Sequence, residues 1–421
     1  MNLAERLRGV VRPAAPAMAD VPNACLADIA ETLGGEWREG RGQRYLIVDR
    51  TYHAGYRLGR VAVADCLPED GRWPRMELLL TEPLAGIPIG PALFLDLETT
   101  GLAGGAGTYA FLVGCGWFEG GVFRVRQFVL TSFAAERALL EDVAALVHAA
   151  GVLVTYNGKT FDAPLIDTRF LFHRLTAPCT GLTHLDLLHP ARRLWRQASD
   201  VHLDEGGASC RLSLMEQAIL GHVRENDVPG FEIPSRYFQF VRSGDARGLD
   251  GVLEHNRLDL LALAMLTARA GQLLDEGAPA ASSAREALGL GRLYERGGLL
   301  DEARACFVRA IELEDDAQIR VEALRAYAVL SRRERRYADA ARAWRQMLSM
   351  RECPARWAQE ATEALAVHHE HRARDLVAAR RFAMQALQFT VTRSRAQAVH
   401  HRLARIDRKL GDPTAHPAPL F

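Results

Sequence analysis

The sequence of 421 residues lacks net charge at neutral pH, because 52 basic side chains balance 52 acidic ones. This balance excludes a protein that coats nucleic acid by bulk attraction, so any contact with phosphate must come from a local site. Lysine is almost missing: Lys159 and Lys409 stand beside 50 arginines. We attribute this bias to codon usage and give it no functional weight.

Paired cysteines and long apolar runs are missing too. The seven cysteines are widely spread without a C-x-x-C pair, which favours reduced thiols of the cytosol. The start, MNLAERLRGVVRPAAP, has no apolar core long enough for a signal peptide. The longest uncharged run, residues 99–118, carries six glycines, which disfavours a spanning helix. We therefore expect a cytoplasmic protein without a membrane segment.

Three stretches of different pattern divide the chain. Residues 1–88 contain a Pro/Ala-rich segment and strand-like sequence but no motif that we can interpret. Residues 89–272 show three strands, a helix, a strand, a helix and a strand, with a hairpin turn at residues 119–121. We expect an α/β domain here, a mixed five-stranded sheet with flanking helices.

The third stretch, residues 273–421, has only helical pattern and repeats itself. The matching positions, 37 and then 39 residues apart, are Ala303, Phe307 and Ala310, then Ala340, Trp344 and Met347, then Ala379, Ala383 and Ala386. Small residues at helix crossings with a large apolar one between them suit stacked helical hairpins, so this region resembles tetratricopeptide repeats. The alternative is an unrelated helical bundle. Residues 281–421 carry 25 basic and 18 acidic side chains, which leaves the preceding part acidic.

A group of acidic residues is the most informative feature. Asp96 and Glu98 end the apolar strand ALFLDLE, and strand alternation places both on one face. Two such carboxylates repel by about 4 kcal/mol at ~4 Å with an effective dielectric of about 20, which a cation relieves. The alternative is a strand end whose acids face solvent. Asp162 begins a helix, where it is either a metal ligand or a plain N-cap residue. His255 and Asp259 lie four residues apart in a helical run and share one helix face.

Three segments in order, FLDLETTGL, YNGKTFDAPLI and HNRLDLLALA, resemble the exonuclease motifs of the DEDD superfamily, which has the ribonuclease-H-like fold. The resemblance covers about residues 92–270. HLDLLHPARRLW, CRLSLMEQAILG and NDVPGFEIPSRYF are similar to the bacterial YprB-like branch, in which such a domain precedes tetratricopeptide repeats. The family implies a 3′ to 5′ exonuclease that acts on DNA or RNA, with a single-stranded end as the expected substrate.

The same resemblance implies roles for individual residues. Two Mg²⁺ or Mn²⁺ ions suit the oxygen ligands and would activate water and stabilise the leaving oxygen. The residues that would hold them are Asp96, Glu98, Asp162 and Asp259. His255 would be the general base, although its spacing from Asp259 is that of the family's tyrosine subgroup. The alternative is that His255 only flanks the metal site.

Substrate binding is assigned to polar residues near the motifs. Those residues are Thr99, Thr100, Asn157, Asp186, Arg192 and Arg193. The arginines alternate with Trp195, as cations and aromatics do in nucleic-acid grooves. The alternatives are that Asn157 only stabilises a turn, and that Asp186 ends a strand with its hydrogen bonds made within the protein. For the arginines, the alternative is that they are solvated beside a packed Trp195.

Two rivals remain for the function. One is a catalytically silent scaffold of the same fold that binds protein partners through the repeats, and the other is a structure-specific endonuclease. The presence of all four acidic residues favours an enzyme, because a scaffold has no need to keep mutually repelling carboxylates together.

Overall fold

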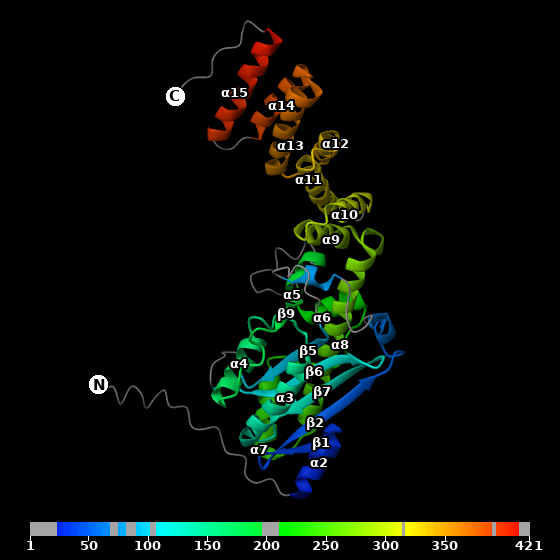
Figure 1. Ribbon diagram of the computed structural model, residues 1–421, viewed down its shortest axis with the longest axis vertical. Coiled ribbons are helices and arrows are strands. Elements are labelled where there is room, and N and C mark those ends of the chain that lie inside the picture. The colour runs from blue at the N-terminus through cyan, green and yellow to red at the C-terminus, as the bar shows by residue number, and fades with distance from the viewer. Residues whose placement is uncertain are drawn as a thin grey trace, which may run out of the picture. The chain divides into compact units, whose positions relative to one another are not determined.

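The computed structural model describes residues 23–67, 75–80, 90–101, 107–195, 210–313, 316–389 and 393–411. The described residues of Met1–Ala191 and Cys210–Gly271 form one compact unit. Those of Arg192–Ser209 and Gln272–Phe421 form a second one. Figure 1 shows the sheet of the first unit and the successive helices of the second.

A mixed sheet of seven strands is the centre of the first unit, in the order β1-β2-β7-β6-β5-β8-β9. Its strands are β1 (Glu36–Gly40), β2 (Gln43–Tyr52), β5 (Ala92–Thr99), β6 (Ala110–Glu119), β7 (Val122–Val129), β8 (Val152–Thr155) and β9 (Thr183–Asp186). β5, β8 and β9 pair in parallel, and the remaining neighbours pair antiparallel. The predicted hairpin turn is confirmed, because Gly120 and Gly121 join β6 to β7 with positive φ angles of 58° and 78°.

The prediction of five strands is wrong. β1 and β2 come from the stretch that we could not interpret, and β2 pairs with β7 from Leu46 opposite Val129 to Tyr52 opposite Phe123. The alternating sequence of this stretch identifies strands but not their partner, because pairing across about 75 residues leaves no local pattern. A separate short hairpin, β3 (Arg57–Leu58) with β4 (Val61–Ala62), follows β2.

Helices pack on this sheet through one hydrophobic cluster. It joins the strands to α3 (Glu136–Ala149), α4 (Asp162–Phe172), α7 (Ile233–Ser243) and the first turns of α8 (Arg247–Glu276). The α-helix α2 (Asn23–Leu33) contributes Ile29 and Leu33 to the same cluster. Two further α-helices are α5 (Leu188–Leu194) and α6 (Leu212–Met215), which is followed by the π-helical turn η6 (Glu216–Leu220). Burial of α4 and α8 against the sheet brings the first residue of α4, Asp162, and the segment of α8 around Asn256 to the end of β5.

The second unit is helical, as predicted. Its helices are α9 (Ala284–Arg296), α10 (Leu300–Glu312), α11 (Ala317–Arg333), α12 (Tyr337–Leu348), α13 (Ala355–His368), α14 (Leu376–Gln388) and α15 (Arg393–Leu410), and each contacts the next. A Cβ on Gly291 would lie 2.5 Å from the Phe307 ring, so glycine lets α9 and α10 cross closely. Among the described helices of the whole chain, none is both long and apolar enough to cross a membrane.

Candidate active site

Asp96 and Glu98 lie on β5, between the antiparallel strand β6 and the parallel strand β8. Their neighbours Leu95 and Leu97 are buried, with 1% and 8% exposure, so strand alternation directs the two carboxylates to the other face. The pairing with β6 shifts register between Glu98 and Thr99. Such an irregularity bends the strand and re-aims its side chains, here directly after the second carboxylate.

Asp96 is held by a buried amide that sequence reasoning missed. Asn256 of α8, fully buried, donates from Nδ2 to Asp96 Oδ2 at 2.7 Å and to the Asp96 carbonyl oxygen at 3.2 Å. Gln127 donates in turn to Asn256 Oδ1 at 2.8 Å and to the Leu253 carbonyl oxygen at 2.8 Å. Gly114 pairs with Asp96 and with Gln127 in the sheet, and a Cβ there would lie 2.3 Å from Asn256 Oδ1.

Two sequence signals point to this arrangement. A glycine within an apolar strand indicates a close approach of another group, and Gly114 has that position. Asn256 stands three residues before Asp259, on the same face of the helix. Neither signal identifies the partner, because the contacts join segments more than 100 residues apart.

The acidic residues lie close enough to affect one another's ionisation. Burial raises the pKa of Asp96 well above its usual range, and the charges of Asp259, Glu98 and Asp162 raise it further. Burial and the charges of Asp259 and Asp162 likewise raise the pKa of Glu98. Burial raises the pKa of Asp162 to about 7, against the lowering effect of backbone hydrogen bonds. The structure thus brings the four motif acids into one electrostatic group.

Asp259 differs from the other three because a guanidinium binds it. Arg224 Nη2 lies 2.5 Å from Asp259 Oδ1. His255 Nε2 lies 3.5 Å from Asp259 Oδ2, and His255 Nδ1 lies 2.6 Å from Asp227 Oδ1. Arg224 and Asp227 were not identified from the sequence, since the loop that carries them has no periodic pattern.

Within the described part of the chain, no three aspartate, glutamate, histidine or cysteine side chains already converge as a metal site. Asp259 instead faces Arg224, as described above. The donor chemistry nevertheless fits a hard divalent cation, because the four acidic side chains offer only carboxylate oxygens. The raised pKa values of Asp96, Glu98 and Asp162 express the same need for positive charge.

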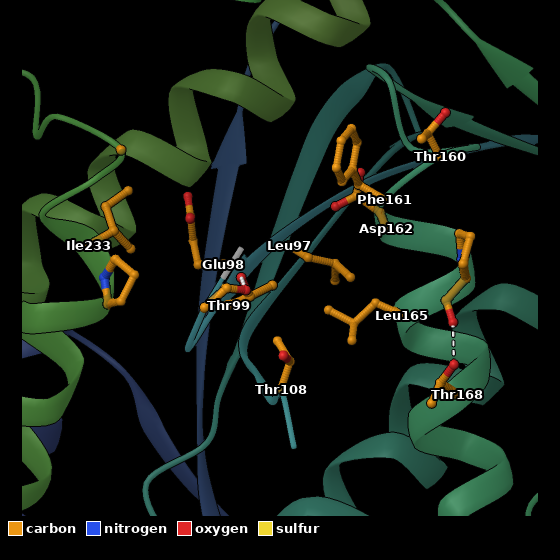
Figure 2. Close-up of a pocket in the computed structure, with 14 residues that line it drawn as sticks. Leu97, Glu98, Thr99, Thr108, Thr160, Phe161, Asp162, Leu165, Thr168 and Ile233 are labelled. Atoms are coloured by element: carbon orange, nitrogen blue, oxygen red, sulfur yellow. Dashed lines mark hydrogen bonds between the residues drawn. The ribbon is translucent and has the colours of Figure 1, made fainter. Parts of the chain in front are cut away.

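A pocket of about 500 Å³ opens beside these acids. Figure 2 shows Glu98 of β5 and Asp162 of α4 around it, together with Leu97 and Leu165. Phe161 lines the pocket and is 58% exposed. The other lining residues are Thr99, Gly101, Thr108, Thr160, Pro164, Thr168, Gly230, Ile233 and Pro234. The pocket thus combines apolar walls with hydroxyls and two carboxylates, which is the usual composition of a small-molecule site.

The two threonines after Glu98 have different positions. Thr99 lines the pocket and its hydroxyl donates to the Gly101 carbonyl oxygen at 3.0 Å. The Thr100 hydroxyl accepts from the Tyr109 backbone N–H at 3.0 Å, which ties the end of β5 to the start of β6. Thr99 therefore faces the pocket, whereas Thr100 is used in the strand connection.

Asp186 supports the turn before α4. Its carboxylate, in a side chain of 3% exposure, accepts from the backbone N–H groups of Asn157, Lys159 and Leu188 at 2.7, 3.2 and 3.1 Å. Asn157 itself has a left-handed φ of 65°. The assignment of Asp186 to substrate binding is thus corrected: its oxygens are used by the turn that positions Asp162, which is the satisfied strand end weighed above.

The arginine and tryptophan segment belongs to the second unit, not to the unit of the carboxylates. Trp195 is 6% exposed and donates from Nε1 to Glu286 Oε1 at 2.9 Å, so it cannot stack on a base. Arg192 is exposed, and burial lowers the pKa of Arg193. The packed tryptophan that we named as the alternative is what the structure contains.

The strand order β7-β6-β5-β8-β9, with helices packed on it and carboxylates at the end of β5, defines an α/β domain of the ribonuclease H class. Residues 93–270 match the model of the RNase_H superfamily. Over 369 residues the chain is 30% identical to the uncharacterized protein YprB of Bacillus subtilis (strain 168), and the match covers 86% of each chain. The chain belongs to the family of YprB and carries an RNase H superfamily domain.

Proposed function

We propose that this protein is a metal-dependent nuclease that hydrolyses phosphodiester bonds of DNA or RNA, removing nucleotides from the 3′ end. The observation that carries the proposal is the electrostatic group of Asp96, Glu98, Asp162 and Asp259, two of which, Glu98 and Asp162, line a pocket of about 500 Å³. Superfamily membership supports the nuclease class. The 3′ to 5′ direction rests on the resemblance of the three motifs alone.

The four acids would hold two Mg²⁺ or Mn²⁺ ions. Such ions supply Lewis acidity toward a phosphodiester and neutralise charge on the leaving oxygen. Asn256 fixes the side chain of Asp96 through its 2.7 Å hydrogen bond, which prepares that carboxylate before a cation arrives. Asp186 performs the equivalent task for the turn that leads to Asp162.

His255 has the geometry of an oriented base. A carboxylate only accepts hydrogen bonds, so the 2.6 Å contact with Asp227 places the imidazole proton on Nδ1. The lone pair of Nε2 then points toward the carboxylate group, where it would take a proton from the attacking water. Asp227 acts here as a positioning residue.

The pocket suits a nucleotide at the end of a chain. Its volume lies within the range of roughly 300–1,000 Å³ typical of ligand sites. The exposed Phe161 ring offers a surface for base stacking, which tolerates any base. The hydroxyls of Thr99 and Thr108 would bind sugar or phosphate oxygens. A site that accepts one terminal nucleotide favours an exonuclease over an endonuclease.

We also infer that the helical unit is a tetratricopeptide-like stack that guides substrate or binds a protein partner. The helix pairs α9–α10, α11–α12 and α13–α14, with small residues at their crossings, support this assignment. A cytoplasmic location agrees with the free thiols of the described cysteines. A silent scaffold is the weaker proposal, since it gives no reason for the grouped carboxylates.

The direct test is digestion of end-labelled single-stranded DNA, duplex DNA and RNA with Mg²⁺, Mn²⁺ or EDTA. We expect stepwise shortening from the 3′ end of at least one substrate with a divalent ion and none with EDTA. Internal cuts would favour the endonuclease, and no cleavage of any substrate by the folded protein would favour the scaffold.

A further inference from the structure

Arg224 lies within the acidic site, but the nuclease mechanism proposed above gives this arginine no role. Its side chain is only 5% exposed. The guanidinium contacts three carboxylates: Glu216 Oε2 at 2.7 and 2.8 Å, Asp259 Oδ1 at 2.5 Å, and Asp227 Oδ2 at 3.4 Å. His255 lies between Asp227 and Asp259, 2.6 Å from the first and 3.5 Å from the second, so Arg224, Asp227, His255 and Asp259 lie in a closed ring of neighbouring side chains.

Glu216 anchors this arginine. Its side chain is fully buried, and its second oxygen lies 2.5 Å from His222 Nδ1. A buried carboxylate needs a partner of opposite charge, so the Glu216–Arg224 pair is neutral and remains together. Arg224 therefore keeps Glu216 as a neutralising partner if its ion pair with Asp259 breaks.

The fold fixes the loop from which Arg224 extends. The backbone N–H of Arg60, in the β3–β4 hairpin, donates to the Leu220 carbonyl oxygen at 2.8 Å. A Cβ on Gly59 would lie 2.2 Å from the same oxygen, so the hairpin touches the end of η6. Residues from the stretch without motifs thus support the loop that carries Arg224 and Asp227.

We propose that Arg224 is a positioning residue that serves as a resident counter-ion of Asp259, so that a divalent cation uses the Oδ1 atom of Asp259 only by replacing the guanidinium. This inference rests on the metal-dependent function proposed above. An arginine stays charged at every relevant pH, and Asp259 cannot give the same oxygen to both cations. Arg224 therefore lowers the affinity of the site for the ion that uses Asp259, while Glu216 keeps the released guanidinium neutralised.

The arrangement predicts opposite effects for two substitutions. Arg224→Met removes the competitor, leaves Asp259 free to join Asp96, Glu98 and Asp162, and should tighten metal binding. Glu216→Gln removes the neutralising charge, so Arg224 should hold Asp259 more strongly and metal binding should weaken. A purely structural arginine predicts lower stability in both variants with no opposite change in metal affinity.

The test is titration of the metal-free full-length protein with Mn²⁺, using the electron paramagnetic resonance signal of free Mn²⁺ to count bound ions. The control is Arg257→Met, because Arg257 lies on the same helix as Asp259 and pairs with Glu254 at 2.7 Å. We expect the weaker Mn²⁺ site to tighten at least tenfold in Arg224→Met, to weaken in Glu216→Gln, and to stay unchanged in the control. Circular dichroism establishes that each variant is folded.

Unchanged or weaker binding in folded Arg224→Met would overturn the inference while leaving the metal site intact. If Arg224→Met does not fold, Glu216→Gln decides the question, and Mn²⁺ binding equal to that of the wild type overturns the inference. A wild-type protein that binds no Mn²⁺ overturns the metal-dependent function itself, and this inference with it.

Discussion

Asn256 Nδ2 lies 2.7 Å from Asp96 Oδ2, above the strand position where Gly114 has no side chain. The hydrogen bond joins a helix and a strand that are 160 residues apart. It connects the packing of α8 on the sheet with the orientation of the first acidic residue of the site. A change that separates α8 from β6 should therefore disturb chemistry and stability together.

Gly114→Ala tests this connection. The new Cβ would lie 2.3 Å from Asn256 Oδ1, so the amide must move and Asp96 loses its donor. We expect a loss of about 1–3 kcal/mol in the free energy of unfolding and at least tenfold slower hydrolysis. Gly248→Ala is the matched control, because a Cβ there meets nothing within 4 Å. Equal behaviour of the two variants in chemical denaturation would contradict the close contact.

The stability of the metal-free protein should depend on pH. Burial raises the pKa of Asp162 to about 7, compared with about 4 in an unfolded chain. The folded state then holds more protons between these values, so stability falls as pH rises from about 4 through about 7. We expect the unfolding free energy to be at least about 1 kcal/mol lower at pH 8 than at pH 5. Thermal unfolding in EDTA measures this difference.

Two results bear on that pH dependence. Asp162→Asn should reduce it, since the asparagine carries no proton to lose. Added Mn²⁺ should raise stability most at pH 8, where the ionised carboxylates bind it. A stability that rises with pH over this range in the metal-free wild type would contradict the electrostatic account.

Phe161 should act on substrate binding and not on folding. Its side chain is 58% exposed and lines the pocket, so Phe161→Ala removes a stacking surface at little cost in stability. We expect KM for an oligonucleotide to rise about tenfold, because stacking contributes about 1–3 kcal/mol per base. Leu171→Ala, which changes an apolar residue of 63% exposure on α4, the helix that Phe161 precedes, is the control. Steady-state kinetics with equal KM values for both variants would remove Phe161 from the site.

His255 and Asp227 should affect the reaction to different extents. His255→Gln removes the proposed base and should lower kcat by about 10²–10⁴. Asp227→Asn keeps the base but loses the carboxylate that lies 2.6 Å from Nδ1, so its loss should be smaller. KM should change little in both. Wild-type kcat in His255→Gln, measured with saturating Mn²⁺, would leave the histidine as a flanking residue only.

Sequence reasoning succeeded where the pattern is local. Alternation in ALFLDLE indicated a buried strand with two acids on one face, and the spacing of His255 and Asp259 indicated a shared helix face. Both features depend on residues within one element. The same reasoning correctly gave the hairpin at Gly120 and the helical C-terminal part.

Long-range contacts explain the failures. β2 pairs with β7 from Leu46 to Tyr52, and no local property of β2 specifies that partner. Arg224 reaches Asp259 from a loop without periodicity, so its role depends on the folded neighbourhood alone. Trp195 resembled a stacking residue by composition, but packing against Glu286 uses its indole N–H.

The most direct test of the carboxylate site is the release of the terminal nucleotide from a labelled oligonucleotide by purified wild type and Asp96→Asn with saturating Mn²⁺. Asp96→Asn keeps the size of the side chain and its contact with Asn256 but removes one charge from the site. The account predicts hydrolysis by the wild type, at least about a thousandfold less by the variant, and an unfolding temperature in EDTA that is equal or higher in the variant. Wild-type turnover by folded Asp96→Asn would contradict the assignment of these carboxylates to a metal-dependent nuclease site.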